Sequence, residues 1–176
     1  MSDLQRRYQL LHGADTEAAR AELERLRTSG KPVVIVSACL LGVRCRFDGH
    51  DKADPAAVAR VAGADEILPL CPEVLARLGV PRPAITLSVD GKQATDARGH
   101  DVTAELEAGV RLADRFAETA GASRALLKER SPSCGVSSVH APDGGLRDGE
   151  GRFTMRLRKR GLPVVSEAAS TSPSAQ

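Results

Sequence analysis

The sequence predicts a single α/β domain of three layers, built around a mainly parallel, Rossmann-like sheet. A chain of 176 residues is long enough for one compact domain with a substantial core. Residues 33–36 form an unbroken run of Val and Ile, which is typical of a strand buried on both faces, as in a parallel sheet. A loop, a helix signal and a second apolar run at 66–70 follow. This stretch is therefore predicted to be a right-handed crossover between parallel strands.

The composition excludes several classes of function. Aromatic residues make up only 2% of the chain, so a base-stacking surface for single-stranded nucleic acid is not expected. The formal net charge is only +2, and positive and negative residues are interspersed along the chain, so the sequence does not predict a basic surface that binds DNA or RNA. No apolar run is long enough to span a bilayer, and no signal peptide opens the chain. We therefore expect a cytoplasmic protein whose four cysteines act as ligands or reactive thiols rather than in disulfides.

Residues 1–30 are predicted to form a helical extension that precedes the domain. Apolar residues recur at helical spacing before Gly13, and Asp15 can cap a second helix with a narrow apolar stripe. We expect these helices to dock on the surface of the domain and to be dispensable for its folding. The alternative is an arm that binds a partner protein.

The first half of the domain, which is predicted to span 31–167, continues with a loop and a helix before the second strand. Residues 43–52 are polar and rich in turn residues, which makes them too irregular for a helix. Asp54 followed by a proline is a strong helix start, and Gly63 is the matching stop.

The second half contains the longest helix, which Thr103 is expected to cap and Gly121 to end. A glycine-rich stretch at 143–151 lacks the Lys-Ser/Thr ending of a phosphate-binding P-loop and is interpreted as a flexible connection or lid. The other predicted elements are a hairpin at 84–95, a strand at 124–128, a basic helix at 153–160, a last strand at 163–166 and a disordered tail at 168–176.

Three cysteines follow the apolar runs that are predicted to be neighbouring strands. Cys39 and Cys71 close the first two runs, and Cys134 follows the strand at 124–128 after a short polar loop. The carboxyl ends of parallel strands meet at one edge of a sheet, where ligands usually bind, so we expect these thiols to converge. Their spacing matches no common zinc signature, and any one of them can be a small core residue. Three together, in loops whose backbone N–H groups can hold sulfide, favour an iron–sulfur site with one open iron position.

The segments around these cysteines resemble the bacterial thiouracil desulfidase family, also called domain of unknown function 523. The matching segments occur in family order and span about Val33 to Glu167. They are SACLLG at 37–42, CRFDG at 45–49, CPEV at 71–74, PRP at 81–83, GHDVT at 99–103 and KERSPSCG at 128–135. The helices before Lys31 and the C-terminal tail depart from the family pattern, but neither touches a motif.

This resemblance implies a [4Fe-4S] cluster held by Cys39, Cys71 and Cys134. It also implies that the remaining iron binds the sulfur of a thiocarbonyl substrate, and that the reaction converts 2-thiouracil to uracil and sulfide. Sulfur is a soft ligand suited to iron, and its binding polarises the carbon–sulfur bond. The implied partner is a small thiolated pyrimidine, and the oligomeric state stays open.

Attack by water on the polarised carbon requires a base and a proton donor near the cluster. Glu73, two residues after one cysteine, and Ser131, three before another, are the candidates for these roles. Each also has a structural interpretation: Glu73 as a favourable charge at a helix N-terminus, and Ser131 as the cap of a turn. Ser37, Asp48 and Lys128 are candidates for substrate binding, although Asp48 before a glycine also fits a simple turn.

Three alternatives remain open for the function. One is the same reaction on a thiolated nucleoside or tRNA base, with the basic helix contacting phosphate. The second is a non-catalytic iron–sulfur redox sensor with Cys45 as an exposed thiol, and the third is a structural zinc site. No role is predicted for the four histidines.

Overall fold

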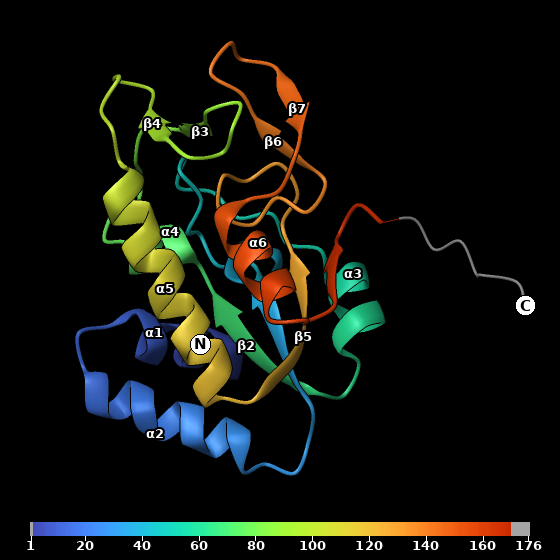
Figure 1. The fold of residues 1–176 in the computed structure, drawn as a ribbon. Coiled ribbons are helices and arrows are strands. Elements are labelled where there is room, and N and C mark those ends of the chain that lie inside the picture. Colours follow the sequence, from blue (N-terminus) through green and yellow to red (C-terminus); the bar gives the residue numbers. More distant parts are fainter. Residues whose placement is uncertain (1, 170–176) are drawn as a thin grey trace, which may run out of the picture.

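A four-stranded parallel sheet lies at the centre of the protein, in a computed structural model that describes residues 2–169 (Figure 1). The strand order is β2-β1-β5-β8, with bounds β1 (Val33–Ser37), β2 (Glu66–Leu70), β5 (Ala122–Leu127) and β8 (Val164–Ser166). All residues of β1 are buried, and both of its neighbours run parallel to it. The predicted mainly parallel α/β sheet is confirmed.

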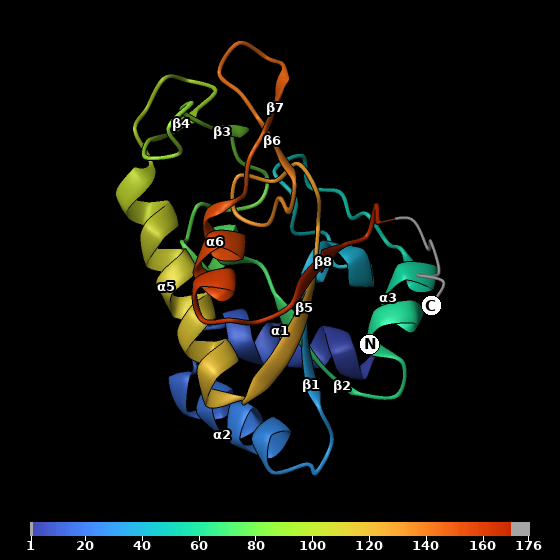
Figure 2. The ribbon, with the colours of Figure 1, turned by 45° about the vertical axis from the view of Figure 1, so that its right-hand side comes forward.

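Helices cover both faces of this sheet and complete the three layers (Figure 2). Successive strand residues point to opposite faces, so Val33 and Ile35 join one core, and Val34 and Val36 join the other. The helices of the first core include α2 (Thr16–Arg27), α5 (Thr103–Thr119) and α6 (Arg152–Lys159). Those of the second are α3 (Pro55–Ala62) and the short 3-10 helix η1 (Ala38–Leu41).

Two small antiparallel hairpins lie beyond the carboxyl ends of the parallel strands (Figure 1). They pair β3 (Ile85–Leu87) with β4 (Ala94–Asp96), and β6 (Ser138–His140) with β7 (Leu146–Asp148). The second hairpin corrects the prediction of a loop at 143–151, because β7 lies inside this stretch. Its turn suits glycine, since Gly144 has a φ of 85° and the Asp143 carboxylate accepts the Gly145 N–H (2.9 Å).

Local signals place the ends of α3 where they were predicted, but not the start of α5. The Asp54 carboxylate accepts the N–H of Ala57 (2.9 Å), and the helix ends at Gly63. In α5, Thr103 is the first helical residue rather than the cap. Its hydroxyl accepts the N–H of Ala94 in β4 (2.8 Å) and so ties the hairpin to the helix instead.

The two N-terminal helices, α1 (Asp3–His12) and α2, pack more deeply than a surface extension would. Leu11 and Leu23 are 2% and 3% exposed, Leu26 is fully buried, and all three belong to the first core. Helix α1 also lies beside β2 at the edge of the sheet (Figure 1). The boundary predicted at residue 30 stays a prediction, but these helices are part of the packing around the sheet.

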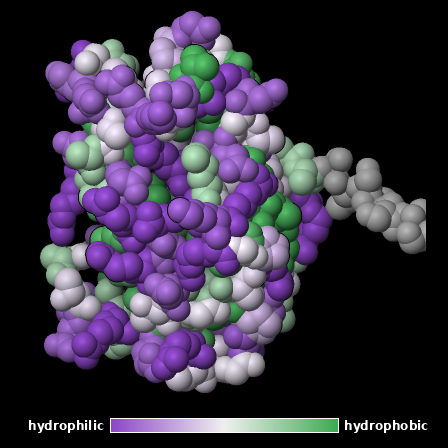
Figure 3. All heavy atoms as spheres, viewed as in Figure 1, coloured by the Kyte–Doolittle hydropathy of each residue, from purple (hydrophilic) through white to green (hydrophobic). Residues whose placement is uncertain are grey.

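The surface and the chain end add three observations. The face seen in Figure 3 is mainly hydrophilic where α5 and α6 lie. Within residues 2–169, no helix is long and apolar enough to cross a membrane. Apart from its first two residues, the predicted disordered tail at 168–176 lies outside the described part of the chain.

Candidate active site

A cavity of about 460 Å³ opens at the carboxyl ends of β1, β2 and β5. The register pairs Ser37 with Leu70 and Val36 with Leu126, so the three strands end at a similar level. The residues that follow each strand therefore line one common space. This is the edge at which open α/β sheets usually bind their ligands.

The three cysteines that were predicted to converge all line this cavity. Cys39 lies in η1 directly after β1, and Cys134 lies in the loop after β5. Cys71 is the N-cap residue of α4 (Pro72–Leu75), where its side chain makes no capping bond and its Sγ lies 3.8 Å from the carbonyl oxygen of Cys45. The structure thus brings the three thiols together, and their role as ligands stays a prediction.

A fourth thiol, Cys45, lines the same cavity, and the sequence did not reveal this. Cys45 is only 2% exposed, so the expectation of an exposed thiol is wrong, and its redox role stays a prediction. The pKa of the Cys45 thiol is raised, mainly by hydrogen bonds with Cys39 and Cys71 and to a smaller extent by burial. The hydrogen bond with Cys45 lowers the pKa of the Cys71 thiol. Burial raises the pKa of Cys134 to about 12.

The chemistry of these donors fits an iron–sulfur cluster. All four cysteines are free thiols that share one cavity. Among residues 2–169, no group of three or more His, Cys, Asp or Glu side chains is arranged to hold a single metal ion. Thiolates are the usual ligands of a [4Fe-4S] cluster, whose several irons spread those ligands around a larger volume.

Glu73 and Arg82 form a buried ion pair in the wall of the cavity. Glu73 is 7% exposed, and its Oε2 lies 2.6 Å from Arg82 Nη2 and 2.8 Å from Arg82 Nε. Arg82 also donates to the backbone carbonyls of Cys45 (3.1 Å) and Gly79 (2.8 Å). A buried carboxylate requires such a partner. Sequence reasoning assigned Arg82 no role, although it lies in the PRP segment that matches the family.

Two serines connect the other oxygen of Glu73 to the loop that carries Cys134. Glu73 Oε1 accepts hydrogen bonds from Ser133 Oγ (2.9 Å) and Ser131 Oγ (3.3 Å). Ser131 Oγ also accepts the N–H of Cys134 (3.0 Å). Ser131 therefore caps the turn and contacts the predicted base at the same time. Ser133 was not predicted from the sequence.

The three candidates for substrate binding have different surroundings. Ser37 and Lys128 line the cavity, and Ser37 Oγ accepts the backbone N–H of Lys128 (3.0 Å), which ties β1 to β5. The Lys128 ammonium is paired with Glu167 (2.6 Å). Asp48 does not line the cavity, because its carboxylate binds Arg46 (3.0 Å) and closes a local turn. The structure therefore favours the turn interpretation of Asp48 over substrate binding.

Glu129 anchors the loop between β5 and β6. Its Oε1 accepts the backbone N–H groups of Val136 (3.1 Å), Ser137 (3.0 Å) and Ser138 (2.8 Å). Burial alone would raise the pKa of Glu129, but the N–H groups of Ser137 and Ser138 outweigh it and lower the pKa to about 2. A single carboxylate thus holds the loop that contains Cys134.

The N-terminal helix α1 reaches the site through a histidine to which no role was assigned. His12 Nε2 lies 3.0 Å from the backbone nitrogen of Cys71, and His12 Nδ1 lies 2.9 Å from the carbonyl oxygen of Tyr8. Burial lowers the pKa of His12 to about 4, which keeps the ring neutral. No local sequence signal could have indicated this contact, because the two residues are 59 positions apart.

Comparisons with known proteins identify the family of this chain. Residues 34–169 match the model of the 2-thiouracil desulfurase family. The chain is 40% identical to the solved [4Fe-4S]-dependent thiouracil desulfidase TudS, with a TM-score of 0.71, covering 78% of this chain and 91% of that one. It is also 30% identical over 145 residues to the uncharacterized protein YbbK of Bacillus subtilis, covering 77% of this chain and 95% of the relative. The predicted family is therefore confirmed, and this chain belongs to the 2-thiouracil desulfurase family.

Proposed function

We propose that this protein removes sulfur from a thiolated pyrimidine such as 2-thiouracil and releases uracil and sulfide. In this proposal a [4Fe-4S] cluster is held by Cys39, Cys71 and Cys134. The observation that carries the proposal is the convergence of strand-end thiols and the Glu73 carboxylate on one cavity. The likeness to a [4Fe-4S]-dependent thiouracil desulfidase supports it.

The cluster, when bound through three thiolates, supplies an iron with an open position, which is suited to soft sulfur and to polarising a carbon–sulfur bond. Exchange of sulfur for a water oxygen involves no net oxidation or reduction. The protein must therefore provide orientation and the transfer of protons.

Glu73 is the proposed base. Arg82 occupies one of its oxygens, so the other, Oε1, is the one available to take a proton from water. Ser131 and Ser133 both contact Oε1, and either hydroxyl can relay that proton toward the departing sulfur. Ser37 and Lys128 remain the candidates for contacts with the pyrimidine.

Anaerobic purification with iron and sulfide analysis, followed by assay of 2-thiouracil, tests the proposal. We expect about four irons per chain, formation of uracil and release of one sulfide for each uracil. Cys134→Ser is the matched control and should lack both iron and activity. A chain that carries the cluster but releases no sulfide from any thiolated pyrimidine would instead support the non-catalytic alternative.

Desulfuration of a thiolated nucleoside or tRNA base is less well supported. It was predicted to use the basic helix α6 to contact phosphate. Three of the arginines of α6 are already paired with acidic residues: Arg152 and Arg156 with Glu107, and Arg158 with Glu150. The proposed substrate therefore remains a small free pyrimidine, and a nucleic-acid partner is not expected. The proposed location is the cytoplasm, where thiols stay reduced.

A further inference from the structure

We propose that the N-terminal helix α1 is part of the cluster-binding site of this protein, with His12 as a positioning residue for Cys71. This inference rests on the proposed function, in which Cys71 is a ligand. The residues that match the family begin at 34, so α1 lies outside the matched region. The contact therefore comes from a segment that the family match does not include.

The ring of His12 is fixed by contacts on both nitrogens. Nδ1 faces the carbonyl oxygen of Tyr8 (2.9 Å) and must carry the proton, which leaves Nε2 free to accept the Cys71 N–H (3.0 Å). The Tyr8 ring stacks on the imidazole with a centroid distance of 3.9 Å. One tautomer and one ring orientation thus satisfy all of these contacts.

The Cys71 amide is a group that needs a partner. Strand β2 lies at the edge of the sheet, so one side of it has no neighbouring strand. Helix α1 takes that place at two points, with Arg7 Nη1 donating to the Ile67 carbonyl (2.7 Å) and His12 accepting from Cys71. Pro69, between them, has no N–H to satisfy. The strand that ends in Cys71 is therefore held to α1 along its outer side.

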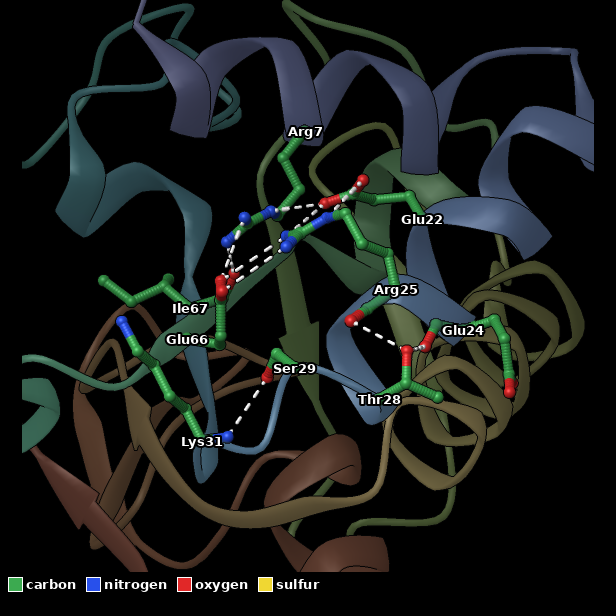
Figure 4. Close-up of polar contacts among 9 residues, drawn as sticks. All are labelled: Arg7, Glu22, Glu24, Arg25, Thr28, Ser29, Lys31, Glu66 and Ile67. Carbon is green, nitrogen blue, oxygen red and sulfur yellow. Dashed lines mark hydrogen bonds and ion pairs between the residues drawn. The ribbon is translucent and has the colours of Figure 1, made fainter.

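Helix α1 is itself held firmly enough to position a ligand. Figure 4 shows Arg7 reaching toward Glu66 of β2 and Glu22 of α2, with Arg25 beside them. The distances are 3.0 Å from Arg7 to Glu66 and 2.7 Å from Arg7 to Glu22. These three side chains are at most 18% exposed. The ion-pair network links α1, α2 and β2 into one unit.

Loss of the acceptor would affect both the ligand and the base. A buried N–H without a partner is unfavourable, so the chain around Cys71 would shift or open to find water. Cys71 directly precedes α4, which carries Glu73. Greater mobility at the N-terminus of α4 would therefore weaken cluster binding and displace the Glu73 side chain.

The test compares His12→Leu, which removes the acceptor, with His12→Gln, whose side-chain oxygen reaches about as far as Nε2. Hydrogen exchange of the Cys71 amide, resolved by mass spectrometry on the cluster-loaded protein, should be about 10-fold faster in His12→Leu. Anaerobic release of iron to a chelator should accelerate by a similar factor. His12→Gln should restore both rates to within about 3-fold of the parent.

Leu23→Ala is the control for a general loss of stability, because it removes a buried contact of α2 without touching Cys71. It should lower the melting temperature but leave the exchange of the Cys71 amide and the release of iron unchanged. If His12→Leu does not fold, His12→Asn replaces it, since its shorter side chain cannot reach the amide.

The outcomes separate this inference from the proposed function. If the parent is loaded with cluster and His12→Leu leaves amide exchange and iron release unchanged, the inference alone is overturned. The inference is also overturned if iron release accelerates in proportion to the loss of melting temperature in both Leu23→Ala and His12→Leu. A parent that purifies anaerobically without iron overturns the proposed function, and the inference fails with it.

Discussion

Glu73 offers its two carboxylate oxygens to different partners. Arg82 holds Oε2 at 2.6 Å, while Oε1 faces Ser131 and Ser133. The arginine balances a charge that burial would otherwise make unfavourable, and the serines connect the carboxylate to the cavity. Glu73 also lies in the first turn of α4, as the structural interpretation of the sequence expected, so one side chain can have this role and the proposed catalytic role together.

Replacement of Glu73 separates these roles. Glu73→Gln should keep its iron but lose roughly 100- to 10,000-fold in turnover, because an amide cannot take the proton from water. It should also lower the free energy of unfolding by about 3 kcal/mol, since Arg82 is left buried without a counter-charge. Anaerobic 2-thiouracil kinetics and urea unfolding measure the two effects.

The double variant Glu73→Gln/Arg82→Met is the matched control. Removal of both charges should recover part of the lost stability but none of the turnover. Turnover within a few-fold of the parent in either variant would rule Glu73 out as the base.

The cysteines differ in their expected contribution to the cluster. Cys39→Ser, Cys71→Ser and Cys134→Ser should each lose most of the iron, because a hydroxyl is a poor substitute for a thiolate ligand. Cys45→Ser should keep most of it, although its thiol lines the same cavity. Iron per chain in anaerobically purified variants decides this. Equal loss in Cys45→Ser would mean four thiolate ligands and no open iron position.

At the scale of elements, the residues that follow the strands form the site, and side chains from elsewhere in the chain anchor two of these segments. Glu129 holds the loop after β5 through three backbone N–H groups. Arg7 and His12 of α1 hold the outer side of β2, at Ile67 near its start and at Cys71 just after its end. These anchors explain how short parallel strands can hold cysteines from distant parts of the chain in one cavity.

The Glu129 anchor predicts a dependence of stability on pH. Its pKa is about 2 in the folded protein and about 4.5 without the fold, so its contribution is complete above pH 4.5 and is lost as the pH falls toward 2. Between pH 6 and pH 2.5 the parent should lose about 2 kcal/mol more unfolding free energy than Glu129→Gln. Urea unfolding of the metal-free chain at both pH values measures the difference. Equal losses in the two proteins would show that Glu129 does not anchor the loop.

At the scale of the whole molecule, the N-terminal helices contribute buried side chains to the core. Leu11, Leu23 and Leu26 are almost completely buried in the core that also contains Phe153 and Leu157 of α6. The sequence favoured a surface extension, because the apolar stripe of α2 is narrow and the rest of that helix is charged. The charges are accommodated in ion pairs at the edge of the sheet (Figure 4).

Deletion of residues 1–30 should therefore destabilise the domain strongly, contrary to the expectation from the sequence. Burial of the three leucines alone accounts for about 5 kcal/mol, a large part of the stability of a typical domain. Expression yield, melting temperature and iron content of the truncated chain test this. A soluble truncated protein with the parent's melting temperature and iron content would show that the helices are dispensable.

The sequence by itself determined the features that depend on neighbours along the chain. Unbroken Val and Ile predict a doubly buried strand, Asp54 and Gly63 mark the ends of α3, and the residues after strands fall at the edge of a parallel sheet. The predicted meeting of Cys39, Cys71 and Cys134 follows from that geometry. It required only that the three strands be neighbours, which the order β2-β1-β5 provides.

Only the tertiary structure decided which side chains meet across the chain. Cys45 joins the other thiols, Arg82 pairs with Glu73, and His12 binds the amide of Cys71, although no local pattern marks any of these contacts. Asp48 shows the converse, since its turn holds it outside the cavity. The physical reason is that burial removes water as a partner, so each polar group must pair with whatever folding brings within reach. That partner is set by the packing of α1 and the loops against the sheet, and a sequence window does not contain it.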